Sequence, residues 1–250
     1  MADMIRMTWF HMRTLWATSF FLETAIGAPL SFILLKLIAA QWRIGQSLWL
    51  DASVSGLWAT TTLAVGIIGF QRFQGVLQYL AASVMQPWRV FLPLVSAASL
   101  IGIIGVPVSF AVIGITAVLT GGPMPMVTSV QFVGYLLAVV ACCSSAMLLA
   151  SVFVLSRMAT AFEPLILIPV WLLCGIVIPV DMMPVPVRLV SFLHPLTSAV
   201  WIARQPSMGW TCWVGIAGCL ALSAVYAAAS LVGLRVALRR ARVEGTLDLA

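Results

Sequence analysis

Charged residues are scarce in this sequence. Asp, Glu, Lys and Arg make up 8% of the 250 residues, hydrophobic residues make up 62%, and the mean hydropathy is +1.12. A soluble domain usually carries about 25% charged residues. So few cannot cover a water-exposed surface, and the surroundings of the chain must be mostly lipid. This excludes a soluble enzyme, a nucleic-acid-binding module and a disordered scaffold, and it indicates an integral membrane protein.

Residues that bind nucleotides or metals, or act in catalysis, are equally rare. The one lysine, Lys36, is followed by Leu37, so no GxxxxGK[ST] phosphate loop is present. The two histidines are His11 and His194, and the sequence contains no HExxH, GxSxG or GxGD motif. We therefore predict no catalytic or metal site, and any ATP must be bound by another chain.

The cysteines are odd in number and all lie in apolar stretches, which gives neither a disulfide framework nor metal-ligand spacing. They are Cys142, Cys143, Cys174, Cys212 and Cys219. The adjacent pair points to different faces of a helix, and we interpret it as two small packing residues.

Six stretches are apolar enough to cross a membrane as helices. The sequence therefore predicts an all-α integral membrane protein with six transmembrane helices in a single domain, residues 1–250. The third stretch is too long for a straight crossing and contains Pro93 and Pro107, so it either kinks or extends beyond the bilayer. The six stretches are 20–39, 52–70, 90–119, 129–155, 164–179 and 210–236.

The arginines predict the orientation of the chain. With a cytoplasmic N-terminus, nine arginines fall on the inner side and three on the outer side, as the positive-inside rule requires. Both termini, including the tail 237–250, are then cytoplasmic. The inner arginines are Arg6, Arg13, Arg72, Arg89, Arg157, Arg235, Arg239, Arg240 and Arg242, and the outer ones are Arg43, Arg188 and Arg204.

Residues 1–17 form an amphipathic segment, which predicts a helix lying in the membrane interface. The alternative is a cleaved signal peptide, but Glu23 interrupts the apolar run. One stripe of the helix is apolar and another is charged: the first contains Ile5, Trp9, Met12 and Trp16, and the second Asp3, Arg6 and Arg13.

Ionisable residues in or near the spans have structural explanations. Lys36 lies close enough to the outer end of its span to snorkel, and Glu23 lies near the inner end. Glu163 precedes Pro164, where an acid complements the helix dipole. An ion pathway would need several acids at mid-depth, and none is there.

Two connecting segments have sequence features that a simple link between spans would not need. In the cytoplasmic segment 71–88, apolar residues recur at helical spacing, which predicts a helix that binds a groove on a partner rather than the membrane surface. The run from Gly175 to Arg204, which covers most of the segment 180–207 and the residues before it, is apolar but interrupted by four prolines, Pro179, Pro184, Pro186 and Pro195. Because lipid-exposed irregular backbone is not tolerated, we predict short helices that re-enter the outer leaflet. Asp181, Arg188 and Arg204 would lie at the water.

These segments resemble a known family. The pattern Arg72-x-x-Gly75-x-Leu77-x-x-Leu80 is similar to the coupling segment of ABC transporter permeases of the type-two (ABC-two) exporter family, E-R-x-x-G-T-L-E-x-L-x-x-S-P. The later run resembles that family's G-x-x-x-P…N-P-L-T…A-L-R region: it extends from Gly175-x-x-x-Pro179 through His194-Pro195-Leu196-Thr197 to Ala203-Arg204. Order, spacing and the six-span plan agree over nearly the whole chain.

The sequence departs from the family pattern in the coupling segment. Gln71 and Gln78 replace Glu, Val76 replaces Thr and Val84 replaces Pro. The lost acids weaken any salt bridge to an ATPase, which leads to the hypothesis that this chain is the weaker half of a heterodimer.

The resemblance implies an ATP-driven exporter of the bacterial plasma membrane. This chain would pair with a second permease, the same or a paralogue, and with two ATP-binding subunits that hold ATP and Mg; it would bind no cofactor itself. The implied coupling residues are Arg72, Gly75, Val76, Leu77, Gln78 and Leu80, and the implied extracellular gate residues are Pro179, Asp181, His194, Pro195 and Leu196.

The substrate is expected to be amphiphilic or hydrophobic, such as an antibiotic or a lipid-like molecule, because Trp and Met offer adaptable apolar surface. Candidate pathway residues are Trp58, Thr61 and Trp171. Close helix packing is expected at small residues, namely Gly102, Gly105, Ser109 and Gly114. The alternatives are a non-transport membrane scaffold and a haem, ion or vitamin transport subunit.

Overall fold

The structure is a computed structural model, which describes residues 2–73, 86–153 and 163–243. Within these ranges the regular secondary structure is helical and no strand occurs. The chain begins with α1 (Ala2–Trp16). The helices that match the predicted spans are α2 (Ser19–Ala39), α3 (Leu48–Phe73), α5 (Pro87–Ile101) with α6 (Gly105–Thr120), α7 (Ser129–Phe153), α8 (Glu163–Leu173) and α11 (Trp210–Val243).

Four of these helical segments are long and apolar enough to cross a membrane. They are α2, the stretch Trp88–Thr120, α7 and Trp210–Ala237 of α11. The pair α9 (Val185–Ser191) and α10 (Pro195–Ala203) passes the same test as one bent segment, and α8 is a shorter apolar helix. The chain is therefore an all-helical, multi-pass membrane protein.

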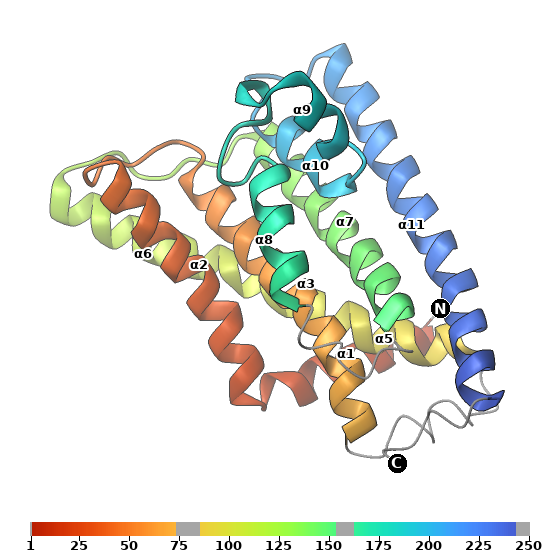
Figure 1. Ribbon diagram of the computed structural model, residues 1–250. Helices are drawn as coiled ribbons and strands as arrows, with labels where there is room; N and C mark the ends of the chain where they lie inside the picture. The colour runs from red at the N-terminus through yellow and green to blue at the C-terminus, as the bar shows by residue number, and fades with distance from the viewer. Residues whose placement is uncertain (1, 74–85, 154–162, 244–250) are drawn as a thin grey trace.

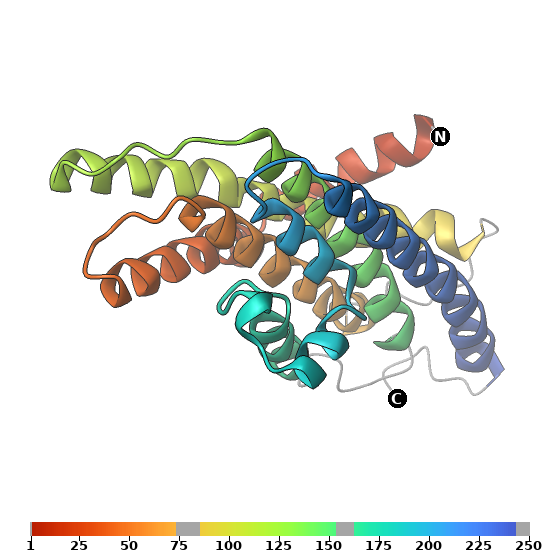
Figure 2. The same cartoon turned by 90° about the horizontal axis from the view of Figure 1, so that it is seen from above.

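Helix α3 lies in the middle of the bundle (Figure 1). It packs against α2, α5, α6, α7 and α8, and α7 in turn packs against α10 and α11. Seen from above, the ends of α2 and α6 extend to one side and α11 borders the other (Figure 2). Helices α9 and α10 lie at the upper end of the bundle in Figure 1, whereas the end of α3 and the end of α11 lie at the lower end.

The long third span is interrupted between its two prolines rather than at either. A 3₁₀ turn, η1 (Gly102–Ile104), joins α5 to α6, and Pro93 lies inside α5. At Gly102 an added Cβ would lie 2.6 Å from Leu57 Cα. The break is thus placed where α3 approaches most closely, since only a residue without a side chain fits there.

Close packing was expected at four small residues, and the structure shows it at three of them, Gly102, Gly105 and Ser109. An added Cβ at Gly105 would lie 3.3 Å from the Ser53 carbonyl oxygen, and Ser109 Oγ lies 3.2 Å from Ser53 Oγ. Gly114 has nothing within 4 Å of an added Cβ, so it is not a packing glycine.

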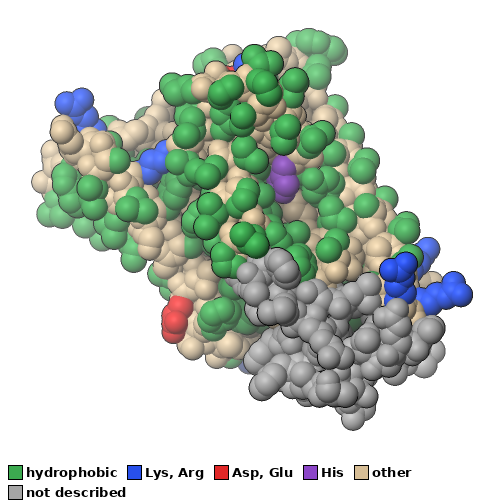
Figure 3. Space-filling model, viewed as in Figure 1, with side chains coloured by type: hydrophobic (Ala, Val, Ile, Leu, Met, Phe, Trp, Pro, Cys, Tyr) green, Lys and Arg blue, Asp and Glu red, His purple; other side chains and the backbone are tan. Residues whose placement is uncertain are grey.

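Helix α1 runs crosswise to the start of α2 (Figure 1) and packs against α5. Leu15 is buried and Met12 packs beside it, whereas Ile5, Trp9 and Trp16 are exposed. Exposed apolar side chains also spread over the face shown in Figure 3, with charged side chains toward its ends. This distribution fits a bundle whose sides face lipid.

Candidate functional site

The predicted re-entrant segment (residues 180–207) is bent back on itself. It contains η3 (Val180–Met182), α9 and α10, and the axes of α9 and α10 differ by 107°. The turn that leads into it contains Gly175 at φ +84, a left-handed conformation that favours glycine. At this position an added Cβ would also lie 2.7 Å from Val180 Cγ2.

His194 joins the bend of this segment to the bundle. Its Nδ1 accepts the backbone N–H of Leu196 at 3.3 Å, which caps α10. Nε2 therefore carries the proton of the neutral ring and donates to Ser145 Oγ of α7 at 3.3 Å. The ring also meets the ring of Trp58 edge-on, with centroids 5.2 Å apart. The predicted gate residue His194 thus contacts both α7 and the predicted pathway residue Trp58.

Further hydrogen bonds hold the two short helices together. Thr197 Oγ1 donates to the Ser191 carbonyl at 2.6 Å, which ties α10 to the end of α9. Cys219 of α11 donates to the Pro195 carbonyl at 3.3 Å. The predicted gate residues Pro195 and Leu196 are buried beside these bonds, whereas Asp181 is exposed and Pro179 is partly exposed.

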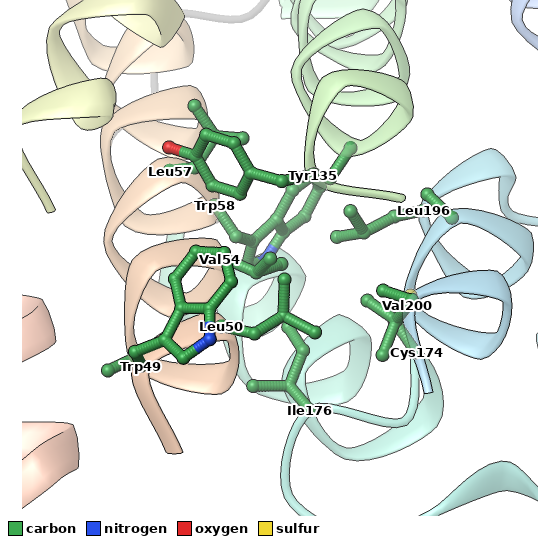
Figure 4. Packing of buried hydrophobic residues seen from close by; sticks show 14 of the residues in the cluster. Trp49, Leu50, Val54, Leu57, Trp58, Tyr135, Cys174, Ile176, Leu196 and Val200 are labelled. Carbon is green, nitrogen blue, oxygen red and sulfur yellow. The ribbon is translucent and has the colours of Figure 1, made fainter. Parts of the chain in front are cut away.

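Within the bundle α10 packs mainly against α7 and α11, and side chains of α3 line another side of this buried contact. Figure 4 shows side chains from α3, among them Leu50 and Trp58, facing Leu196 and Val200 of α10 and Ile176 of the preceding turn. On the other side, α10 approaches α7 so closely that an added Cβ at Gly134 would lie 2.7 Å from Ala203 Cα. The re-entrant segment is therefore packed into the bundle rather than laid on it.

Three charged side chains form a cluster, the Asp51 cluster, where this segment meets α2 and α3. Arg204 Nη2 donates to Asp51 Oδ1 at 2.7 Å, and Lys36 Nζ lies 3.7 Å from Asp51 Oδ2. Lys36 also donates to the Val177 carbonyl at 3.2 Å, and Arg204 to the Ile176 carbonyl at 3.3 Å. The Asp51 side chain is only 5% exposed.

The cluster corrects two expectations. Arg204 does not lie at the water: its side chain is 18% exposed and paired with Asp51. Lys36 does not simply snorkel, because its ammonium group is directed to Asp51 and to a backbone carbonyl. In both cases the cation is bound by a buried carboxylate on another helix instead of being hydrated by bulk water.

Sequence reasoning missed Asp51, although a signal was available. Helices α2 and α3 are consecutive and joined by a short connection. Lys36 lies three positions before the end of α2 at Ala39, and Asp51 lies three positions after the start of α3 at Leu48. Two such helices run antiparallel, so residues equally distant from the connection lie at the same level. Comparing charges across the connection would have paired them.

The three predicted pathway residues are brought to neighbouring parts of the core. Trp58 is 1% exposed and donates through Nε1 to the Leu167 carbonyl of α8 at 3.2 Å. Thr61 is buried and its Oγ1 lies 3.2 Å from Ser99 Oγ of α5. Trp171 is half-buried, with its ring centroid 6.4 Å from that of Phe32. Trp58 lies at the contact between α3 and α8, Trp171 of α8 faces Phe32 of α2, and Thr61 faces α5.

Most of the predicted coupling residues lie outside the described ranges: Gly75, Val76, Leu77, Gln78 and Leu80. Arg72 belongs to the last turn of α3. Both helices that flank this segment, α3 and α5, place their flanking ends away from the re-entrant segment (Figure 1).

All five cysteines have free thiols, as the sequence indicated. Cys142 is buried in the core, whereas Cys143 lines a groove between α1 and α5, so the adjacent pair does point to different sides.

Comparison with known proteins gives one informative result. A search of curated proteins finds no match. Residues 4–206 match the family model described as ABC-2 type transporter, which spans most of the described bundle, from α1 through the Asp51 cluster and the re-entrant segment. The chain therefore belongs to the ABC-2 type transporter family, as a permease subunit of an ABC transporter.

Proposed function

We propose that this chain is the membrane-spanning half of an ATP-driven exporter of amphiphilic or hydrophobic molecules. The observation that carries the proposal is the re-entrant segment, packed at one end of a bundle of the ABC-2 type transporter family. In this arrangement α2, α3, α5–α6, α7, α8 with the turn after it, and α11 make six crossings. The re-entrant segment serves as the external gate.

Permeases of this family work with a separate ATP-binding subunit. Two such subunits and a second permease, identical or paralogous, complete the transporter. ATP and Mg are held by the partner subunits, and closure of those subunits pushes on residues 71–88. Because a ligand shifts an equilibrium only by its different affinity for the two states, ATP must bind the outward-open state more tightly.

The charges support an orientation with both termini in the cytoplasm of a bacterial cell. Helix α1 and the end of α11, which both contain arginines, lie toward the end of the bundle away from the re-entrant segment (Figure 1). This is the distribution that the positive-inside rule favours. The arginines of those two helices whose side chains the structure describes are Arg6, Arg13, Arg235, Arg239 and Arg240.

The proposal predicts that damage to residues 71–88 separates the permease from its ATPase. The double variant Gly75→Arg, Leu77→Asp introduces two charged side chains in the segment that would enter the partner groove. Residues two positions apart on a helix do not face each other, so the charges stay unpaired, and burial of an unpaired charge is strongly unfavourable. We expect an ATP-binding subunit to copurify with the unaltered chain in mild detergent and to be lost with the variant, as measured by mass spectrometry.

A matched control introduces the same two charged residues, Arg and Asp, at the other end of the bundle. Gly45 has nothing within 4 Å of an added Cβ and Met126 is 75% exposed, so Gly45→Arg, Met126→Asp should retain the ATPase. If no nucleotide-binding protein copurifies with the unaltered chain, the exporter assignment fails and a membrane scaffold becomes the better interpretation. If the coupling variant retains the ATPase, the coupling site lies elsewhere.

A further inference from the structure

The Asp51 cluster holds the re-entrant segment at both of its ends. Ile176 and Val177, which offer their carbonyls to Arg204 and Lys36, lie just before the segment begins. Arg204 directly follows α10 near the end of the segment. One buried carboxylate on α3 thus organises two cations that close a loop whose ends, Ile176 and Arg204, are 28 positions apart.

The environment makes these contacts strong but dependent on the exclusion of water. The Asp51 side chain is 5% exposed, so the Coulomb attraction acts in a medium of low dielectric constant. Separating the pair there leaves an unpaired buried charge, which is costly until water reaches it. The re-entrant segment cannot move away from α3 without breaking the contact between Arg204 and Asp51.

The contacts of Arg204 are incomplete, which favours a releasable bond over a permanent one. Its Nε atom is buried and has no hydrogen-bond partner among the residues that the structure describes. Lys36, with its side chain 33% exposed, supplies a second and looser contact to the same carboxylate. A guanidinium that leaves one donor unsatisfied in the closed position gains a hydrogen bond when water enters.

We propose that Asp51, Lys36 and Arg204 form an ionic latch that holds the re-entrant segment closed against α2 and α3. Opening of the external gate transfers Arg204 from Asp51 to water and frees both ends of the segment together. The purpose of this opening rests on the proposed export function, but the latch itself is a property of the isolated permease.

Cys174 offers a natural reporter of the latch. It is fully buried and lies two residues before Ile176, whose carbonyl oxygen accepts a hydrogen bond from Arg204. We would replace the other four cysteines by alanine, place the chain in lipid nanodiscs, where both faces meet solvent, and follow its labelling by a water-soluble, membrane-impermeant maleimide. This measurement needs neither ATPase nor substrate, so its failure is distinct from failure of the export proposal.

We expect Asp51→Asn and Arg204→Gln to accelerate labelling of Cys174 on the order of tenfold or more, because a weaker latch raises the population of the locally open state. Arg204→Lys, which keeps the charge, should restore most of the protection. The matched controls are Arg188→Gln on α9 and Glu23→Gln, an exposed acid on α2, and both should label at the original rate.

Loss of the fold is separated from opening of the gate by a second reporter. In the same variants, a chain that keeps only Cys142, which is buried in α7, should remain unlabelled. If Asp51→Asn also exposes Cys142 to labelling, the milder variant Lys36→Gln is used instead. The latch requires that Lys36→Gln accelerate the labelling of Cys174 and leave Cys142 unlabelled. Unchanged labelling of Cys174 in folded Asp51→Asn and Arg204→Gln proteins would overturn the proposal.

Discussion

Replacing Trp58 with alanine is expected to lower the free energy of unfolding by about 3–5 kcal/mol, the usual cost of deleting a large aromatic side chain from a packed core. Trp58 is 1% exposed, and its indole N–H donates to the Leu167 carbonyl. The substitution creates a cavity, removes this bond between α3 and α8, and removes the ring contact that supports His194. The lower stability should be measurable by thermal unfolding in detergent micelles.

Trp213 provides the matched control, because it is 57% exposed on α11. Trp213→Ala should change the stability by about 0.5 kcal/mol or less, as surface substitutions usually do. Trp58→Phe should fall between the two, since it keeps an aromatic ring but loses the donor. If Trp58→Ala and Trp213→Ala are equally stable, Trp58 is not the packing centre that the structure shows.

The second large effect is expected at Gly134, where α7 meets α10. An added Cβ would lie 2.7 Å from Ala203 Cα and 2.8 Å from Ala203 N, and these are backbone atoms that no side-chain rotation can move. Gly134→Ala should therefore destabilise the protein by about 1–3 kcal/mol, the usual range for overpacking. The displaced helix α10 leads into Arg204, so labelling of Cys174 should accelerate as well.

The control for this substitution is Gly114→Ala on α6. Nothing lies within 4 Å of an added Cβ there, so alanine should be neutral or should stabilise the helix by about 0.5–1 kcal/mol. Thermal unfolding of both variants tests the difference. A Gly134→Ala protein as stable as the Gly114→Ala protein would contradict the close approach of α7 and α10.

The helices could be predicted from the sequence because the apolar runs are long and uninterrupted. The predicted stretch 129–155 begins at the same residue as the helix Ser129–Phe153, and its last two residues lie outside the described ranges. The bend between α9 and α10 was also predictable, because prolines in an apolar run exclude a straight helix. Both features depend on local composition alone.

Contacts between segments were harder to predict. Lys36 has no acidic partner within reach on its own helix, where Glu23 is 13 positions away, and its partner Asp51 lies on the next helix. Arg204 is expected at the water together with Asp181 and Arg188, yet the fold brings it 2.7 Å from Asp51, a residue 153 positions away. Spacing along one helix cannot show such a pairing.

Helix α3 is continuous over its whole length, whereas the neighbouring pair α5 and α6 is interrupted. From Asp51 to Phe73 it runs 22 positions without a break, about 33 Å at 1.5 Å per residue. The parallel route through α5 and α6 is interrupted at Gly102–Ile104. A continuous helix resists compression and bending and moves as one rigid body, whereas an interrupted helix can bend at the interruption. We therefore expect a tilt imposed on α3 near Phe73 to displace Asp51, and the same displacement of α5 to be reduced at η1.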